Sequence, residues 1–346
     1  MSISNNIIIN TENLSKRFGP LVAVDDLTLA IKKGEIFGLV GPDGAGKTTT
    51  MRLLAAIMDP TSGQATVAGF DLRRQPEHIK AHIGYMAQQF ALYSDLTVLE
   101  NLTFFADVFG VHGRMRQERI ERLLNFARLT EFTDRRGGKL SGGMKKKLGL
   151  ACALIHAPDI LFLDEPTTGV DPVSRREFWD ILAGLHTDGT TILVNTPYMD
   201  EAERCTRVGF MVKGRLVEQG TPNQIKALIP GELIEFKPVL SLSQETVSPT
   251  RETSAQRERG QVRGVGLLRR AKRVLANQEG VLEVQTYGDL MHVFVDNFEQ
   301  RRLQLEQTLA AEQIAMTHVR QTAPRMEEAF ISLIGKMSME EVRDQS

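Results

Sequence analysis

The segment Gly41-Pro42-Asp43-Gly44-Ala45-Gly46-Lys47-Thr48 decides the fold of this chain, because it matches the pattern G-x-x-x-x-G-K-[ST]. It follows a short apolar run, residues 35–40, and precedes a run with helical spacing, residues 48–58. Glycines let the backbone turn so that successive N–H groups point at phosphate oxygens, and the following helix adds its positive N-terminal end. The pattern predicts a phosphate-binding loop in which Lys47 neutralises the β- and γ-phosphates of a nucleotide and Thr48 holds Mg²⁺.

Two further residues of this segment carry expectations of their own. Thr49 can donate a hydrogen bond toward the α-phosphate. Asp43 is unexpected, since a carboxylate repels a triphosphate unless the side chain points outward, meets a cation or faces a partner subunit. The competing interpretation is a glycine-rich turn with a surface lysine, and the strand–loop–helix context argues against it.

A second signal of a nucleotide site is the sequence Ile-Leu-Phe-Leu-Asp-Glu-Pro at residues 160–166. Four apolar residues followed by two carboxylates are typical of a buried strand that presents charge at its carboxyl end, where α/β sheets bind ligands. Asp164 suits the role of holding Mg²⁺ through water, and Glu165 suits the role of general base or positioner for an attacking water. Acidic residues also cap helices after strands, but the phosphate-binding loop upstream favours the catalytic interpretation.

Strand-like and helix-like patterns alternate along the first two-thirds of the chain. Short apolar segments rich in β-formers recur over residues 6–14, 27–31, 35–40, 160–163, 191–194 and 208–212. Helical patterns replace them over about 96–155. Strands separated by helix-length segments predict an α/β fold with a mostly parallel sheet, and the helical stretch predicts an insertion within it.

The composition changes near Pro230, which predicts a second domain. We expect a nucleotide-binding domain over 1–228, a strand and flexible linker over 229–266, a small C-terminal α/β domain over 267–336, and a tail over 337–346. The linker is rich in Ser, Thr, Glu and Pro over 241–255. Residues 251–273 hold eight Arg or Lys against two Glu, which indicates a solvated helix face or, as the alternative, a patch that docks lipid or a partner.

Length, charge and cysteine content limit the class of protein. A chain of 346 residues is long enough for two domains, and its formal net charge of -1 gives no support to a general nucleic-acid binder. Two cysteines, Cys152 and Cys205, can build neither a disulfide framework nor a zinc site, which favours a reducing compartment. The N-terminus has no signal-peptide pattern and no run approaches the length of a bilayer span, so we expect a cytoplasmic chain that reaches a membrane only through a partner.

Several motifs between these signals point to one family. The segment Leu140-Ser141-Gly142-Gly143-Met144 resembles the signature sequence of ATP-binding-cassette (ABC) ATPases, and Gly169-Val170-Asp171 resembles their D-loop. The resemblance implies a P-loop NTPase fold that binds ATP and Mg²⁺. It also implies that Phe18 stacks on adenine and that Gln88, as the Q-loop glutamine, is a catalytic residue and a ligand of Mg²⁺ together with Thr48 and Asp164.

The signature segment also has a chemical interpretation. Ser141 followed by Gly142 and Gly143 at the start of a helical run is an N-cap with bare backbone amides, and therefore an anion site. In the family this site binds the γ-phosphate of ATP held by the other subunit, so that two cassettes enclose two nucleotides head to tail. The cluster Lys145–Lys147 suits a phosphate or an acidic partner, and a merely solvated cluster is the alternative.

The sequence departs from the family pattern at two positions. Met144 replaces the signature glutamine, and Pro197 stands where the switch segment of the family has histidine. Proline has neither a side-chain donor nor a backbone N–H, so it cannot contact a γ-phosphate through either group. His156, next to Ala157-Pro158, is expected to be a structural residue at a helix end rather than a replacement.

These observations support one leading function and two alternatives. The small C-terminal domain, which ends Pro-Arg-Met-Glu-Glu-Ala-Phe over residues 324–330, resembles the tail of ATPase subunits of bacterial drug and multidrug exporters, in particular the first cassette of tandem-cassette ATPases. The resemblance implies an ATP-hydrolysing subunit, peripheral on the inner face of the cell membrane, whose partners are permease subunits and a second ABC cassette. That cassette is expected to be a different chain, with a copy of this one as the alternative. A soluble ABC ATPase outside transport and a nucleotide sensor with little turnover are the competing functions.

Overall fold

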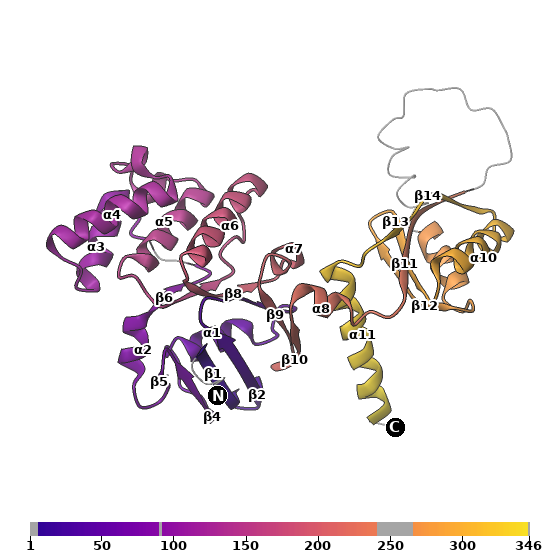
Figure 1. The fold of residues 1–346 in the computed structure, drawn as a ribbon, viewed down its shortest axis with the longest axis horizontal. Helices are drawn as coiled ribbons and strands as arrows, with labels where there is room; N and C mark the ends of the chain where they lie inside the picture. Colours follow the sequence, from indigo (N-terminus) through magenta and orange to yellow (C-terminus); the bar gives the residue numbers. More distant parts are fainter. Residues whose placement is uncertain (1–5, 90–91, 241–265, 345–346) are drawn as a thin grey trace. The chain divides into compact units, whose positions relative to one another are not determined.

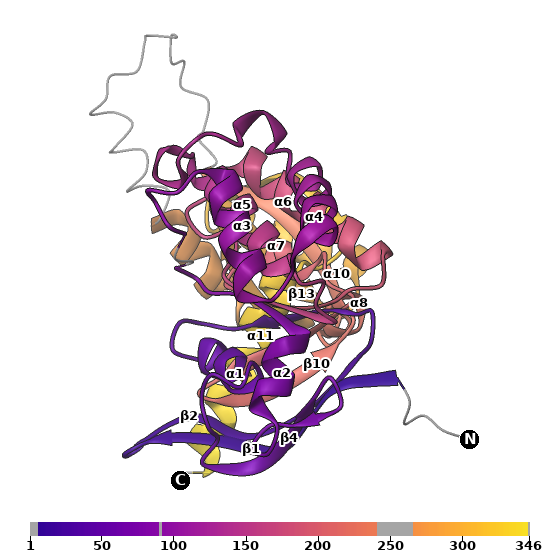
Figure 2. The same ribbon diagram turned by 90° about the vertical axis from the view of Figure 1, so that its left-hand side faces the viewer.

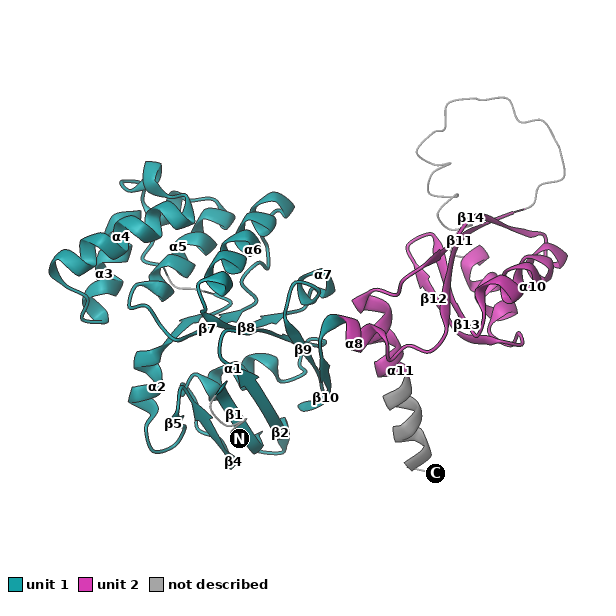
Figure 3. Ribbon diagram, viewed as in Figure 1, with its two compact units in different colours: residues 1–222 teal, residues 223–346 magenta. Residues whose placement is uncertain are grey.

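The computed structural model describes residues 6–89, 92–240 and 266–344, and these divide into two compact units, 1–222 and 223–346 (Figures 1 and 3). The predicted linker, 241–255, and most of the basic segment, 251–273, lie outside the described residues. Among the residues that are described, no helix is both long enough and apolar enough to cross a bilayer.

The first unit begins with a four-stranded antiparallel sheet in the order β2-β1-β4-β5. Its strands are β1 (Ile7–Phe18), β2 (Leu21–Lys32), β4 (Ser62–Val67) and β5 (Phe70–Asp71). Buried positions alternate over residues 9–11 of β1 and 27–31 of β2, and the buried apolar set, which includes Ile9, Leu27 and Leu29, joins one core with residues of the next sheet. The register therefore fixes which face of this sheet is covered.

The second sheet of this unit has six strands in the order β10-β9-β3-β8-β7-β6. They are β3 (Ile36–Val40), β6 (Ile83–Met86), β7 (Ile160–Asp164), β8 (Thr191–Thr196), β9 (Arg207–Val212) and β10 (Arg215–Gly220). Strands β6, β7, β8, β3 and β9 run parallel, and β10 pairs antiparallel with β9. Every residue of β3, β7 and β8 is buried, as expected for parallel strands covered on both faces, so the predicted α/β fold is confirmed.

Helices cover this sheet on both sides. Figures 1 and 2 show α3, α4, α5 and α6 gathered on one side and the antiparallel sheet on the other, with α1 between the two sheets. The helices of this unit are α1 (Lys47–Leu54), α2 (Pro76–His82), α3 (Val98–Val108), α4 (Gly113–Ala127), α5 (Gly142–Leu154), α6 (Pro172–Thr187) and α7 (Met199–Ala202), whereas α8 (Pro222–Lys226) lies in the second unit apart from its first residue. The stretch 96–155 thus contains α3, α4 and α5, and α3 starts at a capping box in which Thr97 and Glu100 bond each other's backbone N–H.

The second unit is built on a four-stranded antiparallel sheet in the order β12-β13-β11-β14. Its elements are a helix over 266–275, β11 (Glu232–Leu240), β12 (Val281–Tyr287), β13 (Leu290–Val295), α10 (Phe298–Ala311), β14 (Ile314–Thr322) and α11 (Met326–Asp344). Strand β11 is longer than the predicted 233–236, because it pairs on both sides with β13 and β14, so it belongs to this sheet rather than to a linker. Helix α11 runs through the predicted tail, 337–346, as far as Asp344, since no proline or glycine follows Gly335 to end it.

A polar cluster is buried in the second unit. His292 Nδ1 lies 2.8 Å from Glu328 Oε1, and His292 Nε2 lies 3.1 Å from Glu235 Oε2. All three residues are at most 2% exposed. Burial raises the pKa of Glu328, but the hydrogen bonds from His292 and from the backbone N–H of Arg325 outweigh it and leave that pKa below its usual value.

This shift predicts how the stability of the second unit depends on pH. A carboxyl whose folded pKa is depressed stabilises the fold above its unfolded pKa, and the contribution is lost as pH falls through the folded value. Glu328→Gln should lower the free energy of unfolding at pH 7 by about 1–3 kcal/mol, and the difference from wild type should shrink as pH falls below about 4. Urea unfolding across this range is the measurement, with the exposed Glu306→Gln as the control. A difference that grows toward low pH would contradict the assignment.

Candidate functional site: a nucleotide cleft at the carboxyl edge of the sheet

The parallel register brings the candidate residues to one edge of the sheet. Val40, the last residue of β3, pairs with Thr196 of β8, and Asp164, the last residue of β7, pairs with Asn195 of β8. The chain leaves β3 into the phosphate-binding loop and leaves β7 into Glu165. The edge predicted from the apolar strands and their terminal carboxylates therefore exists, at the place where open α/β sheets bind ligands.

A cleft of about 290 Å³ opens over the phosphate-binding loop. It is lined by Phe18, Leu21, Val22, Ala23, Asp43, Gly44, Ala45, Gly46, Lys47, Thr48, Thr49 and Glu165. Phe18 is 45% exposed at its mouth, and an exposed aromatic face beside a phosphate loop can stack on a nucleobase. The cleft thus brings the predicted loop residues 43–49 together with Phe18 and Glu165, whereas the predicted Gly41 and Pro42 do not line it.

Lys47 is buried at the base of this cleft. Its Nζ donates to the carbonyl oxygens of Gly41 (2.8 Å) and Pro42 (2.9 Å), so the charge has partners before any phosphate arrives. Burial lowers the pKa of Lys47, and the nearby carboxylates of Asp43, Glu165 and Asp164 oppose that shift. Asp43 is exposed at the rim and faces this cation, which is one of the arrangements that make a carboxylate tolerable here.

The loop conformation depends on glycine at particular positions. Gly44 and Gly46 both have positive φ, +77° and +99°. A Cβ on Gly44 would meet nothing within 4 Å, whereas one on Gly46 would lie 2.1 Å from the carbonyl oxygen of Ala23. Gly46 is therefore required both for its conformation and for the close approach of β2 to the loop.

These two glycines form a matched pair for a stability prediction. Gly44→Ala should lower the free energy of unfolding by about 1–2 kcal/mol, because it adds only the backbone strain of positive φ. Gly46→Ala should lower it by about 2–5 kcal/mol, because strain and steric overlap add. Thermal or urea unfolding of both variants is the measurement, and equal losses would contradict the close approach to Ala23.

Thr48 and Asp164 form the candidate Mg²⁺ site. Thr48 Oγ1 donates to Asp164 Oδ1 at 3.0 Å, and Asp164 is 1% exposed. Tyr85 OH lies 3.4 Å from Asp164 Oδ2, and burial together with this carboxylate raises the pKa of Tyr85 to about 12. A hydroxyl and a carboxylate are the oxygen ligands that Mg²⁺ prefers, so these residues fit the ion.

Glu165 lies between the phosphate loop and Gln88. Gln88 Nε2 donates to Glu165 Oε2 at 2.7 Å, and Thr168 Oγ1 donates to the same oxygen at 3.1 Å. Lys146 Nζ donates to the backbone oxygen of Gln88 at 3.0 Å, and burial lowers its pKa. The predicted glutamine and the predicted base are thus direct neighbours, and one of the three signature lysines lies beside them.

The predicted anion site at Ser141, Gly142 and Gly143 lies elsewhere. Ser141 caps α5 and accepts a hydrogen bond from the Met144 N–H at 3.3 Å, as the capping argument predicts. A Cβ on Gly143 would lie 2.5 Å from Ser174 Oγ, so this glycine lets α5 approach α6. None of the three lines the phosphate-loop cleft, so within one chain they complete no nucleotide site with it.

The switch segment follows β8 and carries Pro197 after Thr196. Thr196 Oγ1 donates to Glu201 Oε2 at 2.6 Å, and Thr167 donates to the other oxygen of the same buried carboxylate. No histidine is among the cleft-lining residues in the part of the chain that is described. His156 instead stacks on Phe109 with ring centroids 3.9 Å apart and lies 2.9 Å from the Ile83 carbonyl oxygen, which agrees with a structural role.

Three contributors to the site were not predicted from the sequence. Residues 21–23 line the cleft because β2 begins beside the loop, and no local pattern indicates that approach. Tyr85 reaches Asp164 across paired strands. Asn195 is fully buried against Asp164 and Thr48, and it had a usable signal: it is a polar residue at the carboxyl end of an apolar strand, like Asp164 itself.

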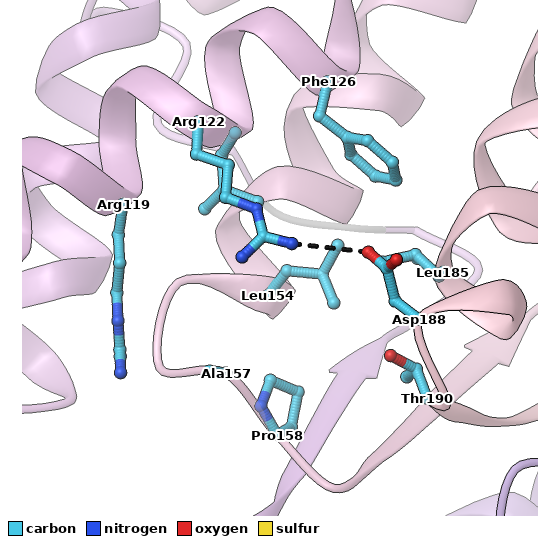
Figure 4. A pocket seen from close by; sticks show the side chains of 10 residues that line it. Arg119, Arg122, Phe126, Leu154, Ala157, Pro158, Leu185, Asp188 and Thr190 are labelled. Atoms are coloured by element: carbon cyan, nitrogen blue, oxygen red, sulfur yellow. Dashed lines mark hydrogen bonds and ion pairs between the residues drawn. The ribbon is translucent and has the colours of Figure 1, made fainter.

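A second cavity of about 270 Å³ lies between α4, the end of α5 and the end of α6 (Figure 4). Leu123, Phe126, Leu154, Pro158 and Leu185 give it an apolar wall. Arg122 and Asp188 approach to 3.3 Å beside it, and both are well exposed. Residues that precede β7 and β8 line this cavity, so it lies at the amino edge of the sheet, opposite the nucleotide cleft.

Fold and cleft together define a P-loop nucleotide-binding protein with an ABC-type cassette. The family model described as "ABC transporter" matches residues 24–168. The chain is 42% identical over 228 residues to the daunorubicin resistance ATP-binding protein DrrA2 of Streptomyces coeruleorubidus, covering 66% of this chain and 71% of that protein. This chain belongs to the ABC transporter ATP-binding family.

Other relatives place the cassette within the chain. The chain is 47% identical over 220 residues to the "probable multidrug ABC transporter ATP-binding protein YbhF" of Escherichia coli (strain K12). The matched residues make up 64% of this chain but only 38% of that protein, so the chain spans little more than a third of the length of this relative. A solved ATP-binding subunit of an ABC transporter is similar with a TM-score of 0.59 at 28% identity, covering 64% of this chain and 92% of that one. The solved structure of a dimeric ATP-binding cassette bound to ADP and Pi has a TM-score of 0.56 at 26% identity, and the match covers 62% of this chain and 98% of that one.

Proposed function

We propose that this chain binds and hydrolyses Mg-ATP to energise an exporter of the drug or multidrug type, whose membrane-spanning permease subunits are separate chains. The observation that carries the proposal is that one chain contains two separated half-sites. One is the cleft with Lys47, Thr48, Asp164 and Glu165, and the other is the capped glycine pair after Ser141. A nucleotide sandwiched between two cassettes uses one half-site from each.

The cleft supplies the parts that phosphoryl transfer to water requires. Lys47 and the loop N–H groups would hold the β- and γ-phosphates, and Phe18 would stack on the base. Thr48 and Asp164 would hold Mg²⁺, which neutralises developing phosphate charge when it is bound. Glu165, oriented through its Oε2 by Gln88 and Thr168, would accept the proton of the attacking water.

An exposed apolar cluster formed by α3 and the residues that flank it supports a docking site for the permease. Phe104, Val108 and Phe109 are 37%, 61% and 39% exposed, and Tyr93 meets Phe104 edge-on with centroids 4.6 Å apart. Apolar side chains gathered on a surface are typical of a protein–protein contact. We assign this surface to the membrane partner, which would place the chain peripherally on the inner face of the cell membrane.

Pro197 supports a partner cassette that is a different chain. In a pair of identical chains both sites would lack the switch histidine, whereas a different chain could supply one complete site. The same proline favours the second candidate function, a nucleotide sensor with little turnover, because it removes one expected contact to the γ-phosphate.

Hydrolysis by the purified chain separates these two functions. Wild type is expected to release phosphate from Mg-ATP slowly but measurably, because Glu165 is intact. Glu165→Gln should abolish that release, since an amide cannot accept the proton, and Glu121→Gln on the exposed face of α4 should leave it unchanged. Tight ATP binding with equal phosphate release in wild type and Glu165→Gln would favour the sensor.

A further inference from the structure

Asn195 is a buried polar residue whose place none of the motifs explains. It is 0% exposed, it lies one residue before the end of β8, and its backbone pairs with Asp164 of β7. Its Nδ2 donates to Asp164 Oδ1 and lies 3.4 Å from Thr48 Oγ1. Asn195 therefore touches both residues that would hold Mg²⁺.

These contacts fix the orientation of the Asp164 carboxylate. Oδ1 accepts from Thr48 and from Asn195, and Oδ2 lies 3.4 Å from the Tyr85 hydroxyl. A neutral amide can hold a carboxylate in this way without adding charge, whereas a second acid would repel it. Residues that orient metal ligands in this manner control the affinity of a site for its ion.

One atom of Asn195 lacks a partner. Its Oδ1 is buried and accepts no hydrogen bond within the described part of the chain. An unsatisfied buried acceptor is costly, and it is relieved when a donor arrives. Within the described residues the hydrogen bonds of this side chain are therefore made by Nδ2 alone, to Asp164 and Thr48.

We propose that Asn195 is a positioning residue for Mg²⁺: its side-chain amide holds Asp164 and Thr48, the two residues that would bind the ion, in place. The inference rests on the proposed function, because it assumes that the cleft binds Mg-ATP. Asn195 is therefore expected to affect the affinity of the cleft for Mg²⁺ and not its affinity for metal-free ATP.

The test compares Asn195→Leu, which keeps the number of side-chain heavy atoms and removes both polar groups, with Asn101→Leu. Asn101 is an equally buried amide that bonds the backbone oxygens of Tyr93, Leu96 and Thr97, away from the cleft. Calorimetric titration of the full chain with ATP, in EDTA and at a series of Mg²⁺ concentrations, is one measurement. Binding of Mn²⁺ in the presence of ADP, followed by electron paramagnetic resonance, is the second.

Asn195→Leu should raise the Mg²⁺ concentration for half-maximal enhancement of ATP binding by about tenfold and weaken Mn²⁺ binding similarly, with ATP affinity in EDTA within about twofold of wild type. Asn101→Leu should leave both readouts unchanged. Equal Mg²⁺ dependence in wild type and Asn195→Leu, or an equal loss in EDTA and in Mg²⁺, would overturn the inference. Should Asn195→Leu fail to fold, Asn195→Ala undergoes the same titrations with the same expectation. Wild type that shows no Mg²⁺-enhanced ATP binding would instead overturn the proposed function.

Discussion

Replacing Lys47 with alanine is expected to lower the affinity of the chain for ATP by about tenfold or more. Lys47 is the one cation among the residues that line the cleft, as far as the structure describes them, and its Nζ already lies at the base of the loop on the carbonyl oxygens of Gly41 and Pro42. Charge-assisted contacts of this kind contribute about 1.5–3 kcal/mol, which corresponds to about 10-fold to 150-fold in affinity.

Titration calorimetry of the full chain measures this effect. Lys80→Ala is the control, because Lys80 lies on α2 with an exposed partner, Glu77, away from the cleft. The affinity of Lys80→Ala should equal that of wild type. Unchanged ATP binding by Lys47→Ala would show that the loop does not bind the phosphates, and the assignment of the cleft would be wrong.

The second large effect concerns the complex with the permease and a second cassette. Ser141→Arg should abolish most of the ATP hydrolysis by this complex. The backbone N–H groups at the start of α5, which Ser141 caps, would bind the nucleotide held by the partner, and a bulky arginine at this position would block that contact. Glu165→Gln should reduce the rate only partly, since Pro197 already limits the site of this chain. The complete site would be the one built on the loop of the partner cassette.

Steady-state phosphate release by the assembled complex tests this asymmetry. Ser174→Arg is unsuitable as a control because Ser174 lies against Gly143, whereas Arg replacing the exposed Leu303 of α10 changes a surface outside the cassette. Leu303→Arg should leave the rate unchanged. A mild effect of Ser141→Arg together with complete loss in Glu165→Gln would show that the site of this chain carries the turnover.

The sequence was informative where a function depends on local pattern. The glycines around Lys47 and the apolar strands that end in Thr196 and Asp164 specify a loop and a sheet edge, and the structure shows both. Strong local signals of this kind combine a turn that needs glycine with a strand that needs burial on both faces.

Contacts that depend on the pairing of strands distant in the sequence were harder to predict from the sequence alone. The role of residues 21–23 in the cleft follows from how β2 approaches the loop, and the length of β11 follows from its pairing with β13 and β14. Asn195 shows the intermediate case, in which its position after an apolar run was visible but its partner became clear only from the register of β7 and β8. The two strands are separated by a helix in the sequence, so the pattern within either strand does not specify which residues pair.

Coupling of ATP hydrolysis to a membrane complex through two half-sites is the role that we propose for this chain. Its most direct test is the rate of ATP hydrolysis by membranes that contain the permease subunits and the second cassette, measured with and without this chain. Adding wild type is expected to raise the rate well above the sum of the separate components, and adding Ser141→Arg to raise it little. A rate that is the same with wild type, with Ser141→Arg and without the chain would contradict the claim.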